Sequence, residues 1–205
     1  MPTLPMFPLG SVLVPHQPLP LHVFEERYRL LVRDCLAGDR TFGVVLIERG
    51  SEVGGGDVRF GIGCTAVIAE AEQTDDGRWG LIATGGTRFR VDEWLPDEPY
   101  PRAEVTMIDD GDWTADAAIA MEHAIVAFNR VVELARQLGS TIDPAVLDLA
   151  GEPVLDHWLL VGRAPVGPLD RLALLSAETP ERRLDLLTGH LAEVEAVLAS
   201  RLGGG

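Results

Sequence analysis

The sequence contains no lysine. All 17 basic side chains among its 205 residues are arginine. A phosphate-binding GxxxxGK[ST] loop needs a lysine that reaches the β- and γ-phosphates, so these residues hold no nucleotide hydrolase site of that class. A Schiff base with pyridoxal phosphate and a Ser-Lys catalytic dyad also need a lysine amine. The absence of lysine therefore excludes three kinds of catalytic chemistry from these residues.

Cysteines and long apolar runs are also scarce. Cys35 and Cys64 form no CxxC motif and lie in apolar patterns, which is typical of buried free thiols in a reducing compartment. No apolar run approaches the roughly 20 residues that a membrane helix requires, and the N-terminus lacks the basic region of a signal peptide. We therefore expect a cytoplasmic protein without a membrane partner.

Acidic residues dominate the charge. The 32 acidic side chains leave a formal net charge of -15, and only Arg182 and Arg183 are adjacent among the scattered arginines. Nucleic acid binding gains most of its affinity from basic contacts to phosphates. The charge therefore disfavours a nucleic acid as partner.

The composition changes near residue 110. Up to Ile108 the chain is rich in Gly, Pro, Val and Thr in short runs, and after Trp113 it becomes rich in Ala and Leu. The stretch from Asp92 to Asp112 between them holds eight acidic residues and one arginine. Such a polar, proline-containing stretch indicates a domain boundary. We predict one subdomain at residues 1–110 and a second at 111–205.

The first part predicts a small β-barrel with one inserted helix. Its early prolines disfavour a helix before about residue 24, whereas Glu25 and Glu26 precede an apolar stripe that ends at Gly38, which predicts a single helix. Many short strands around one helix favour a barrel. The strand-like runs are Phe42–Ile47, Val58–Phe60, Cys64–Ala71, Gly80–Thr84, Arg88–Trp94 and Ala103–Ile108.

The second part predicts a helical bundle. Thr114 is a helix cap for a long stripe of apolar residues that ends at Gly139. Asp143-Pro144 indicates a short helix ending at Gly151, and Pro153, Pro168 and Pro180 each suit the first turn of a further helix. The predicted fold class is α+β.

The sequence holds no catalytic or metal motif. Gly61 to Ala66 matches the GxGxxG/A dinucleotide fingerprint, but a β-like run follows it instead of a helix, so we interpret its glycines as close-packing positions in a strand. His190 and Glu193 share a helix face, yet two ligands do not make a zinc site. We expect no cofactor, no metal and no catalytic residue.

Residues 4–32, LPMFPLGSVLVPHQPLPLHVFEERYRLLV, closely resemble the opening of the Lon protease N-terminal (substrate-binding) domain. That family begins with LPLFPL, VLFPG and LPLHIFEPRYR, from which this sequence departs at Met6, Val14, His16 and Glu26. Later segments are similar to the family's successive strands and closing helices: Phe42–Leu46, Ile62–Ile68, Asp76–Arg78, Gly85–Val91, Pro99–Val105 and Arg171–Leu198.

The resemblance implies a PUA-like β-barrel with an attached helical bundle. In full-length Lon this region recognises unfolded or degron-bearing polypeptides, while downstream ATPase and Ser-Lys protease domains perform hydrolysis. The sequence ends at Gly205 without either, so we expect a stand-alone, non-enzymatic form of the domain.

The residues of the motif favour structural roles. Pro8, Pro15 and Pro20 fix extended turns, whereas Leu9, Phe24 and their apolar neighbours Val12, Leu19 and Leu21 are expected to fill the barrel. We interpret His22 as a core histidine, with ligand contact as the alternative. Arg27 belongs to the same motif. Glu25 or Glu26 is expected to pair with Arg88 or Arg90.

Our leading hypothesis is a polypeptide-binding module that acts in proteolysis, with a protease or chaperone as a further partner. Clients would use apolar or edge-strand surface where the barrel meets the helices. The candidate contacts are Phe7, Phe24, Tyr28, Phe89 and Trp94. One alternative is an RNA-binding module, which predicts a basic groove. The other is a small-molecule enzyme, which predicts a deep pocket containing His22 or Glu25 and is opposed by a filled barrel.

Overall fold

The chain folds into two units, Met1–Asp109 and Asp110–Gly205. The computed structural model describes residues 2–52, 54–139 and 149–203. The boundary predicted at residue 110 lies next to this division. The short helix predicted to begin at Asp143 lies outside the described residues.

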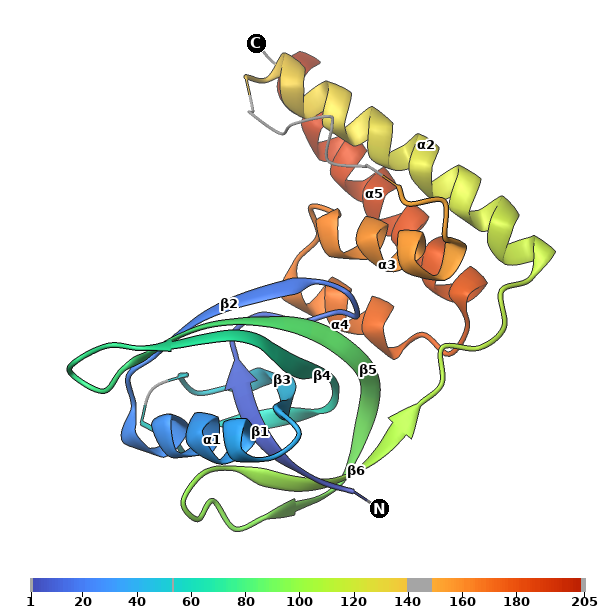
Figure 1. Ribbon diagram of the computed structural model, residues 1–205. Coiled ribbons are helices and arrows are strands. Elements are labelled where there is room, and N and C mark those ends of the chain that lie inside the picture. Colours follow the sequence, from blue (N-terminus) through green and yellow to red (C-terminus); the bar gives the residue numbers. More distant parts are fainter. Residues whose placement is uncertain (1, 53, 140–148, 204–205) are drawn as a thin grey trace. The chain divides into compact units, whose positions relative to one another are not determined.

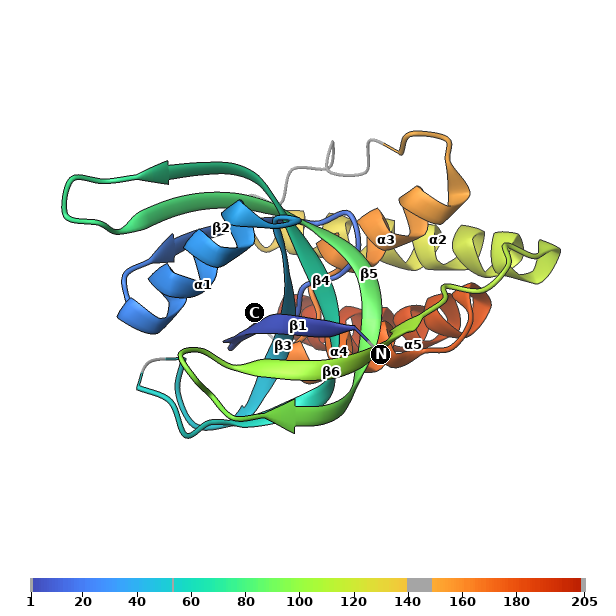
Figure 2. The ribbon, with the colours of Figure 1, turned by 60° about the horizontal axis from the view of Figure 1, so that its bottom comes forward.

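The first unit is a closed β-barrel with one extra strand (Figures 1 and 2). The strands β5, β4, β3, β1 and β6 close into a ring because β6 pairs with both β1 and the second part of β5. The remaining strand, β2, pairs with the first part of β5, on the edge opposite β4. The β1 and β3 strands are parallel, and every other pairing is antiparallel. The bounds are β1 Thr3–Leu9, β2 Pro18–Val23, β3 Thr41–Arg49, β4 Val58–Gln73, β5 Trp79–Leu95 and β6 Arg102–Ile108.

The inserted helix α1 (Glu26–Ala37) lies between β2 and β3 in the chain and begins and ends as predicted. Glu26 occupies its first turn, and the Gly38 N–H bonds back to the Cys35 carbonyl at its end. Its buried face packs Tyr28, Leu31 and Val32 against the barrel unit. The predicted barrel with one inserted helix is confirmed.

Two of the predicted strand pairs are single long strands. The runs Val58–Phe60 and Cys64–Ala71 form one strand, β4, and the runs Gly80–Thr84 and Arg88–Trp94 form β5. The glycines between the predicted runs do not end the strands. The continuous strands have register shifts between Cys64 and Ala66 and beyond Ile68. The two strands therefore extend as a hairpin beyond the barrel (Figure 1).

The glycines of β4 and β5 permit close backbone approach. A Cβ atom at Gly63 would overlap the Val44 carbonyl oxygen, which confirms Gly61–Ala66 as strand and not as a nucleotide loop. A Cβ at Gly85 would overlap the Val14 carbonyl oxygen in the same way. The Gly85 backbone accepts from His16 N at 2.8 Å and donates to Gln17 O at 2.9 Å. The segment before β2 is thereby attached to the bend of β5.

Side chains fill the barrel interior. Met6, Phe42 and Phe89 are 0% exposed. Phe89 packs in a cluster with Leu4, Met6, Val45, Ala103 and Val105. A Cβ on Gly43 would overlap Met6 Sδ and crowd the Phe89 ring. Because glycine has no side chain, Met6 and Phe89 can occupy this space in the core. Burying each such aromatic side chain stabilises the fold by about 1.5–3 kcal/mol.

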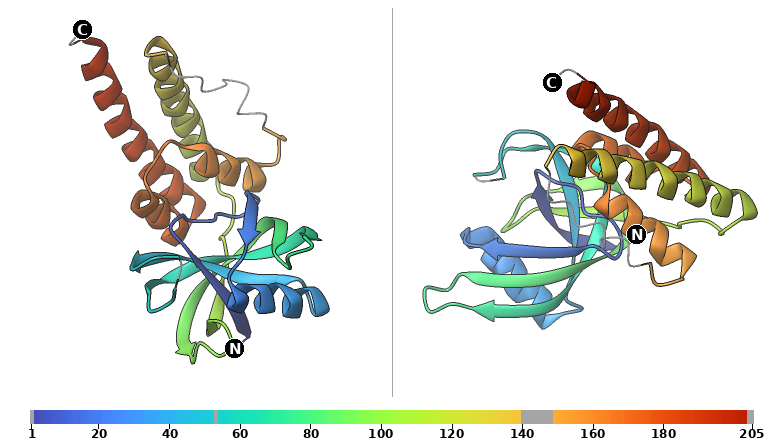
Figure 3. Two further views of the ribbon diagram at one scale, coloured as in Figure 1. Left: turned by 90° about the vertical axis from the view of Figure 1, so that its left-hand side faces the viewer. Right: turned by 90° about the horizontal axis from the view of Figure 1, so that it is seen from above.

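The second unit is helical, with bounds α2 Ala115–Gln137, α3 Pro153–Arg163, α4 Pro168–Ser176 and α5 Pro180–Gly203. The helices α2 and α5 lie side by side along most of their lengths (Figure 3). Thr114 Oγ1 accepts from Ala117 N at 3.1 Å, which confirms the predicted cap. Pro153 and Pro168 occupy first turns as predicted. Among the described residues, none of the helices is both long and apolar enough to cross a membrane.

A buried arginine joins three segments of the helical unit. Arg183 is 0% exposed; its Nη1 lies 2.9 Å from His157 Nε2, and its other donors reach the Leu174 and Ala177 carbonyls. Its guanidinium lies 4.0 Å from the centre of the Trp158 ring, and Trp158 donates to Asp110. Burial and the neighbouring Arg183 charge lower the pKa of His157 to about 4. His157 is therefore neutral at pH 7 and accepts from Arg183.

Candidate functional site

A cavity of about 190 Å³ lies in the barrel unit. It is formed by the end of β1, by β2, by the first turn of α1 and by the loop between β3 and β4. All of these segments belong to the first unit. Its lining residues are Phe7, Leu9, Pro20, Leu21, His22, Val23, Phe24, Glu25, Tyr28 and Glu52.

Two stacked aromatic rings form the floor. The Phe7 and Tyr28 ring centroids are 4.2 Å apart at an interplanar angle of 15°. Phe7 is 8% and Tyr28 is 3% exposed. Burial raises the pKa of the Tyr28 hydroxyl to about 12, so this group stays neutral. The Arg27 guanidinium covers the Tyr28 ring, 4.4 Å from its centroid. The floor is therefore apolar and rigidly packed.

An exposed phenylalanine forms the rim. Phe24 links β2 to α1 and is 52% exposed, whereas its neighbour Val23 is 2% exposed. A half-exposed aromatic side chain beside an apolar cavity is typical of a binding surface. Phe24 therefore presents contact area to a ligand that enters the cavity.

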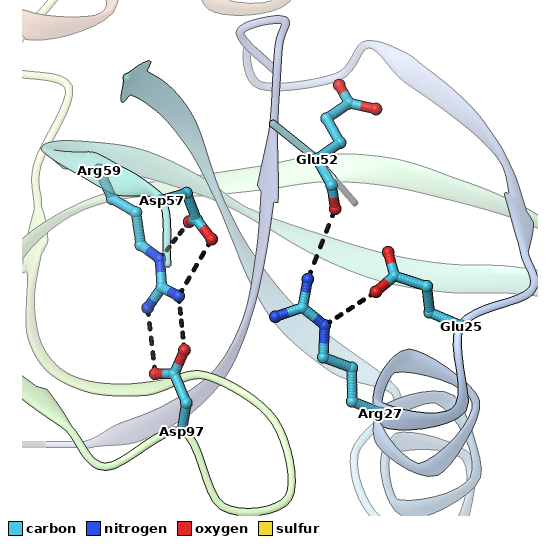
Figure 4. A network of polar contacts seen from close by, with 6 residues as sticks. All are labelled: Glu25, Arg27, Glu52, Asp57, Arg59 and Asp97. Carbon is cyan, nitrogen blue, oxygen red and sulfur yellow. Dashed lines mark hydrogen bonds and ion pairs between the residues drawn. The ribbon is translucent and has the colours of Figure 1, made fainter. Parts of the chain in front are cut away.

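One network holds the loop that carries Glu52 (Figure 4). Glu25 Oε2 accepts from Arg27 Nε at 3.2 Å and from Gly54 N at 3.4 Å. Arg27 Nη2 donates to the Glu52 carbonyl at 3.5 Å, and Glu52 Oε1 accepts from Gly10 N at 2.5 Å. These contacts attach the loop to the helix start and to the end of β1.

A second network holds the far end of the same loop (Figure 4). Arg59 donates to Asp57 at 2.5 Å and to Asp97 at 2.6 Å, and it lies 4.8 Å from the Trp94 ring centroid. The side chains of Arg59 and Asp57 are 8% and 1% exposed. Burial opposes ionisation of Asp57, but the hydrogen bonds and charge of Arg59 prevail and lower its pKa. The loop between β3 and β4, which forms one wall of the cavity, is thus held at both of its ends.

The structure brings together most of the predicted motif. Of the proposed peptide contacts, Phe7, Phe24 and Tyr28 line the cavity, together with the motif residues Leu9, Pro20, His22 and Glu25. Pro8 and Pro15 are buried, as expected of structural positions. Trp94 lies beside Arg59 and is not among the lining residues.

Phe89 is the one proposed contact that the structure contradicts. Its side chain is wholly buried in the barrel core, because Gly43 and Gly63 leave room for the ring inside. A client cannot reach it in the folded state. Its assignment as a peptide contact is wrong.

Two expectations about the motif are also wrong. His22 and Phe24 were expected in the core, but both are exposed, because Leu21 and Val23 take the inward positions of β2. The pairing of Glu25 or Glu26 with Arg88 or Arg90 does not form. Glu25 pairs with Arg27, and Glu26 with Arg29 at 3.0 Å. Their side chains are close in sequence, so a local partner replaces the distant one; Arg88 instead donates to the Asp109 carbonyl.

Sequence reasoning missed Glu52 and the Asp57–Arg59–Asp97 network. The only signal nearby was the run Gly54–Gly56, which marks a loop. All three glycines have positive φ, so the run does set the loop conformation. It does not indicate where the loop packs.

The cavity suits side chains better than a cofactor. Sites for drug-sized ligands measure roughly 300–1,000 Å³, which is larger than this cavity. Within the described ranges 2–52, 54–139 and 149–203, no cluster of three or more His, Cys, Asp or Glu side chains could hold a metal ion. The arrangement supports binding of an apolar side chain.

The free edge of β2 offers little to an added strand. Among the described strands, β2 pairs with β5 alone. Pro18 and Pro20 have no N–H, and prolines are tolerated in a paired strand where the missing N–H would point away from the partner strand, here β5. The outward edge therefore lacks two of its donors. A peptide gains more from inserting side chains than from pairing its backbone here.

The comparison with known families agrees with this geometry. Over residues 3–193 the chain matches the family described as the ATP-dependent protease La (LON) substrate-binding domain. It is 28% identical over 199 residues to Lon protease 2 of Herpetosiphon aurantiacus, which covers 95% of this chain and 24% of that protein. It is 33% identical over 110 residues to Lon protease 2 of Myxococcus xanthus, which covers 52% of this chain and 13% of that protein.

Solved structures share the fold. The crystal structure of a Lon N-terminal domain protein from Xanthomonas campestris has a TM-score of 0.65 and 30% identity, covering 92% of this chain and 98% of that one. The N-terminal domain of a Mycobacterium avium complex Lon protease also has a TM-score of 0.65, at 17% identity, covering 94% and 99%. The second likeness bears on the fold alone.

Proposed function

Since the chain belongs to the family of Lon substrate-binding domains, we propose that it is a non-catalytic module that binds unfolded or degron-bearing polypeptides. The chain spans 24% of the length of the Herpetosiphon relative, so the activity of the whole relative is not transferred to it. The module binds through the cavity between β1, β2 and α1. One observation carries the proposal: an exposed phenylalanine, Phe24, stands over a small apolar cavity with a packed aromatic floor.

Binding proceeds by side-chain insertion. A client places one or two apolar side chains against the Phe7–Tyr28 floor, and Phe24 packs on them from the rim. Aromatic anchors that fill a desolvated pocket commonly supply most of the energy of such contacts. The free edge of β2, which lacks the N–H donors of Pro18 and Pro20, supports this mode over strand addition.

The two alternatives lack a supporting observation. An RNA-binding barrel needs a basic groove, but six arginines of the barrel unit are paired with acids: Arg27, Arg29, Arg33, Arg59, Arg78 and Arg90. A small-molecule enzyme needs a deep site, and Phe89 and Met6 fill the barrel interior. Both observations count against the alternatives.

An adaptor or regulatory role in proteolysis, with a protease or chaperone as partner, belongs to the same proposal. Co-purification from the native cell tests it. A cytoplasmic location is also part of the proposal, and the two buried free cysteines, Cys35 and Cys64, are in keeping with a reducing compartment.

The binding test uses a fluorescent peptide with a central Leu-Phe pair in Ser-Gly flanks, titrated with the protein and followed by anisotropy. Phe24→Ala is expected to weaken binding at least about fivefold, because loss of a central aromatic contact typically costs more than about 1 kcal/mol. Ile119→Ala is the matched control, since Ile119 is 53% exposed on α2 and outside the cavity. Equal affinity of wild type and Phe24→Ala, or no binding at all, would exclude this site.

A further inference from the structure

The charged side chains that line the cavity are both acidic, and the nearby Arg27 contacts one of them, Glu25, and covers the Tyr28 ring. Glu25 and Glu52 are the charged side chains among the cavity-lining residues, and no arginine lines it. Each carboxylate keeps one oxygen available. Glu25 Oε2 accepts from Arg27 and Gly54, and Glu52 Oε1 accepts from Gly10, while the second oxygen of each accepts no hydrogen bond from the described residues.

A neighbouring hollow repeats this pattern. It measures about 340 Å³ and lies over the paired strands β2, β5 and β4. Its walls are apolar at Leu21, Leu81 and Ile82, and its charged residues are Glu70 and Glu72, again without an arginine. Leu21 lines both this hollow and the cavity. Two adjacent concave surfaces of the barrel unit therefore combine apolar walls with glutamates, of which only Glu25 is in an ion pair.

Elsewhere in the barrel unit, acids are commonly neutralised by arginines. Asp57, Asp76 and Asp92 each pair with an arginine two residues away. Glu52, Glu70 and Glu72 make no ion pair with the described residues, and Glu25 is paired with Arg27 through one oxygen only. All four glutamates line the two concave apolar surfaces. A ligand that complements them carries positive charge beside its apolar side chain.

We infer that the module selects basic polypeptide segments, in which an apolar or aromatic residue is flanked by lysine or arginine. This inference rests on the proposed polypeptide-binding function and names its client class. The apolar residue enters the cavity, and the flanking cations lie against Glu25 and Glu52. The net charge of -15 adds long-range attraction that raises the association rate of such clients at low salt.

Three labelled peptides test the inference. They share a Leu-Phe pair and differ in their flanks, which are Lys-Gly, Ser-Gly or Glu-Gly. An exposed ion pair commonly changes affinity by about threefold, so two such pairs multiply to about tenfold tighter binding of the Lys peptide than of the Ser peptide at 25 mM NaCl. The ratio of the Lys-peptide affinity to the Ser-peptide affinity is expected to fall to about threefold at 300 mM NaCl, because salt screens exposed charges. The Glu peptide is expected to bind most weakly.

Substitutions locate the selectivity. Glu25→Gln with Glu52→Gln is expected to remove most of the preference for Lys over Ser. The control, Glu122→Gln with Glu193→Gln, makes the same change in net charge on exposed positions of α2 and α5 and is expected to retain the preference. Equal effects of the two double variants would overturn the inference, because the selectivity would then follow total charge and not the site.

The peptides also separate this inference from the proposed function. If the Ser peptide binds in a Phe24-dependent manner and the three flanks give equal affinity, the charge selectivity fails while polypeptide binding stands. If no peptide binds, the proposed function fails and the inference with it. A Phe24-dependent dimer in sedimentation equilibrium, together with loss of peptide binding in the dimer, would assign the cavity to a second copy and overturn both.

Discussion

The buried His157–Arg183 pair makes the stability of this protein depend on pH. His157 is 0% exposed, and burial together with the Arg183 charge lowers its pKa from 6.5 to about 4. In the unfolded chain the imidazole recovers its ordinary pKa and takes up a proton near pH 6.5. The folded state therefore has its full stability above pH 6.5 and loses it as the pH falls toward 4. Linkage puts the loss at about 2 kcal/mol between pH 7.5 and pH 5.

A non-titrating side chain isolates this effect. In His157→Gln the amide can accept from Arg183 and donate to the Pro153 carbonyl, the two contacts that His157 makes at 2.9 and 3.2 Å. The substitution costs some stability at every pH, but that cost does not change with pH. The difference in unfolding free energy between wild type and variant should therefore fall by about 2 kcal/mol from pH 7.5 to pH 5.

Urea denaturation followed by circular dichroism at 222 nm measures this difference, since the signal reports mainly on the helices. Titration of other acidic groups is common to both proteins and cancels in the comparison. A difference that stays constant from pH 7.5 to pH 5 would refute the reasoning. It would mean that His157 is protonated equally in the folded and unfolded states.

Three further outcomes are expected. Phe89→Ala should lower the unfolding free energy by about 3–5 kcal/mol in urea, because the ring fills the barrel core; a loss below about 1 kcal/mol would contradict that packing. Arg59→Ala should cost about 3 kcal/mol, since it leaves the 1% exposed Asp57 carboxylate unpaired, and Asp57→Asn in the same background should recover part of the loss. Burial raises the pKa of Cys35 to about 12, so iodoacetamide at pH 8 should modify this thiol only after unfolding, as mass spectrometry can check.

Local signals in the sequence were sufficient for the helices. Thr114 caps α2 by accepting from a backbone N–H three residues away, and Pro153 and Pro168 occupy first turns. Each of these features depends on residues within one turn of the chain. The helix boundaries could be predicted because the interactions that decide them lie within a few residues.

The long strands could not be predicted in this way. The glycines of Gly61–Ala66 are predicted as strand positions, but the predicted runs still stop at Phe60 and at Thr84, whereas β4 and β5 continue through both points. A glycine in an apolar run can end a strand or let another backbone approach it. Which of these happens depends on distant segments, such as Val14 beside Gly85 and Val44 beside Gly63.

The residues of the site, too, were determined partly by the sequence and partly by the tertiary structure. The sequence alone determined that these residues lack the lysine of an ATPase loop or a Ser-Lys dyad, and its first motif named Phe7, Phe24 and Tyr28. It could not decide which aromatic ring faces solvent. Phe24 is exposed and Phe89 is buried because the closure of the barrel, and not the local pattern, sets the inward direction.

The charges at the site were decided by tertiary structure alone. Glu25 belongs to the start of α1, and Glu52 belongs to a loop 27 residues later that Arg27 and Gly10 hold in place. Composition determines that the chain is acidic. Only the folded chain decides which carboxylates are neutralised by arginines and which remain beside an apolar cavity, because ion pairing depends on distances of a few ångströms between segments far apart in sequence.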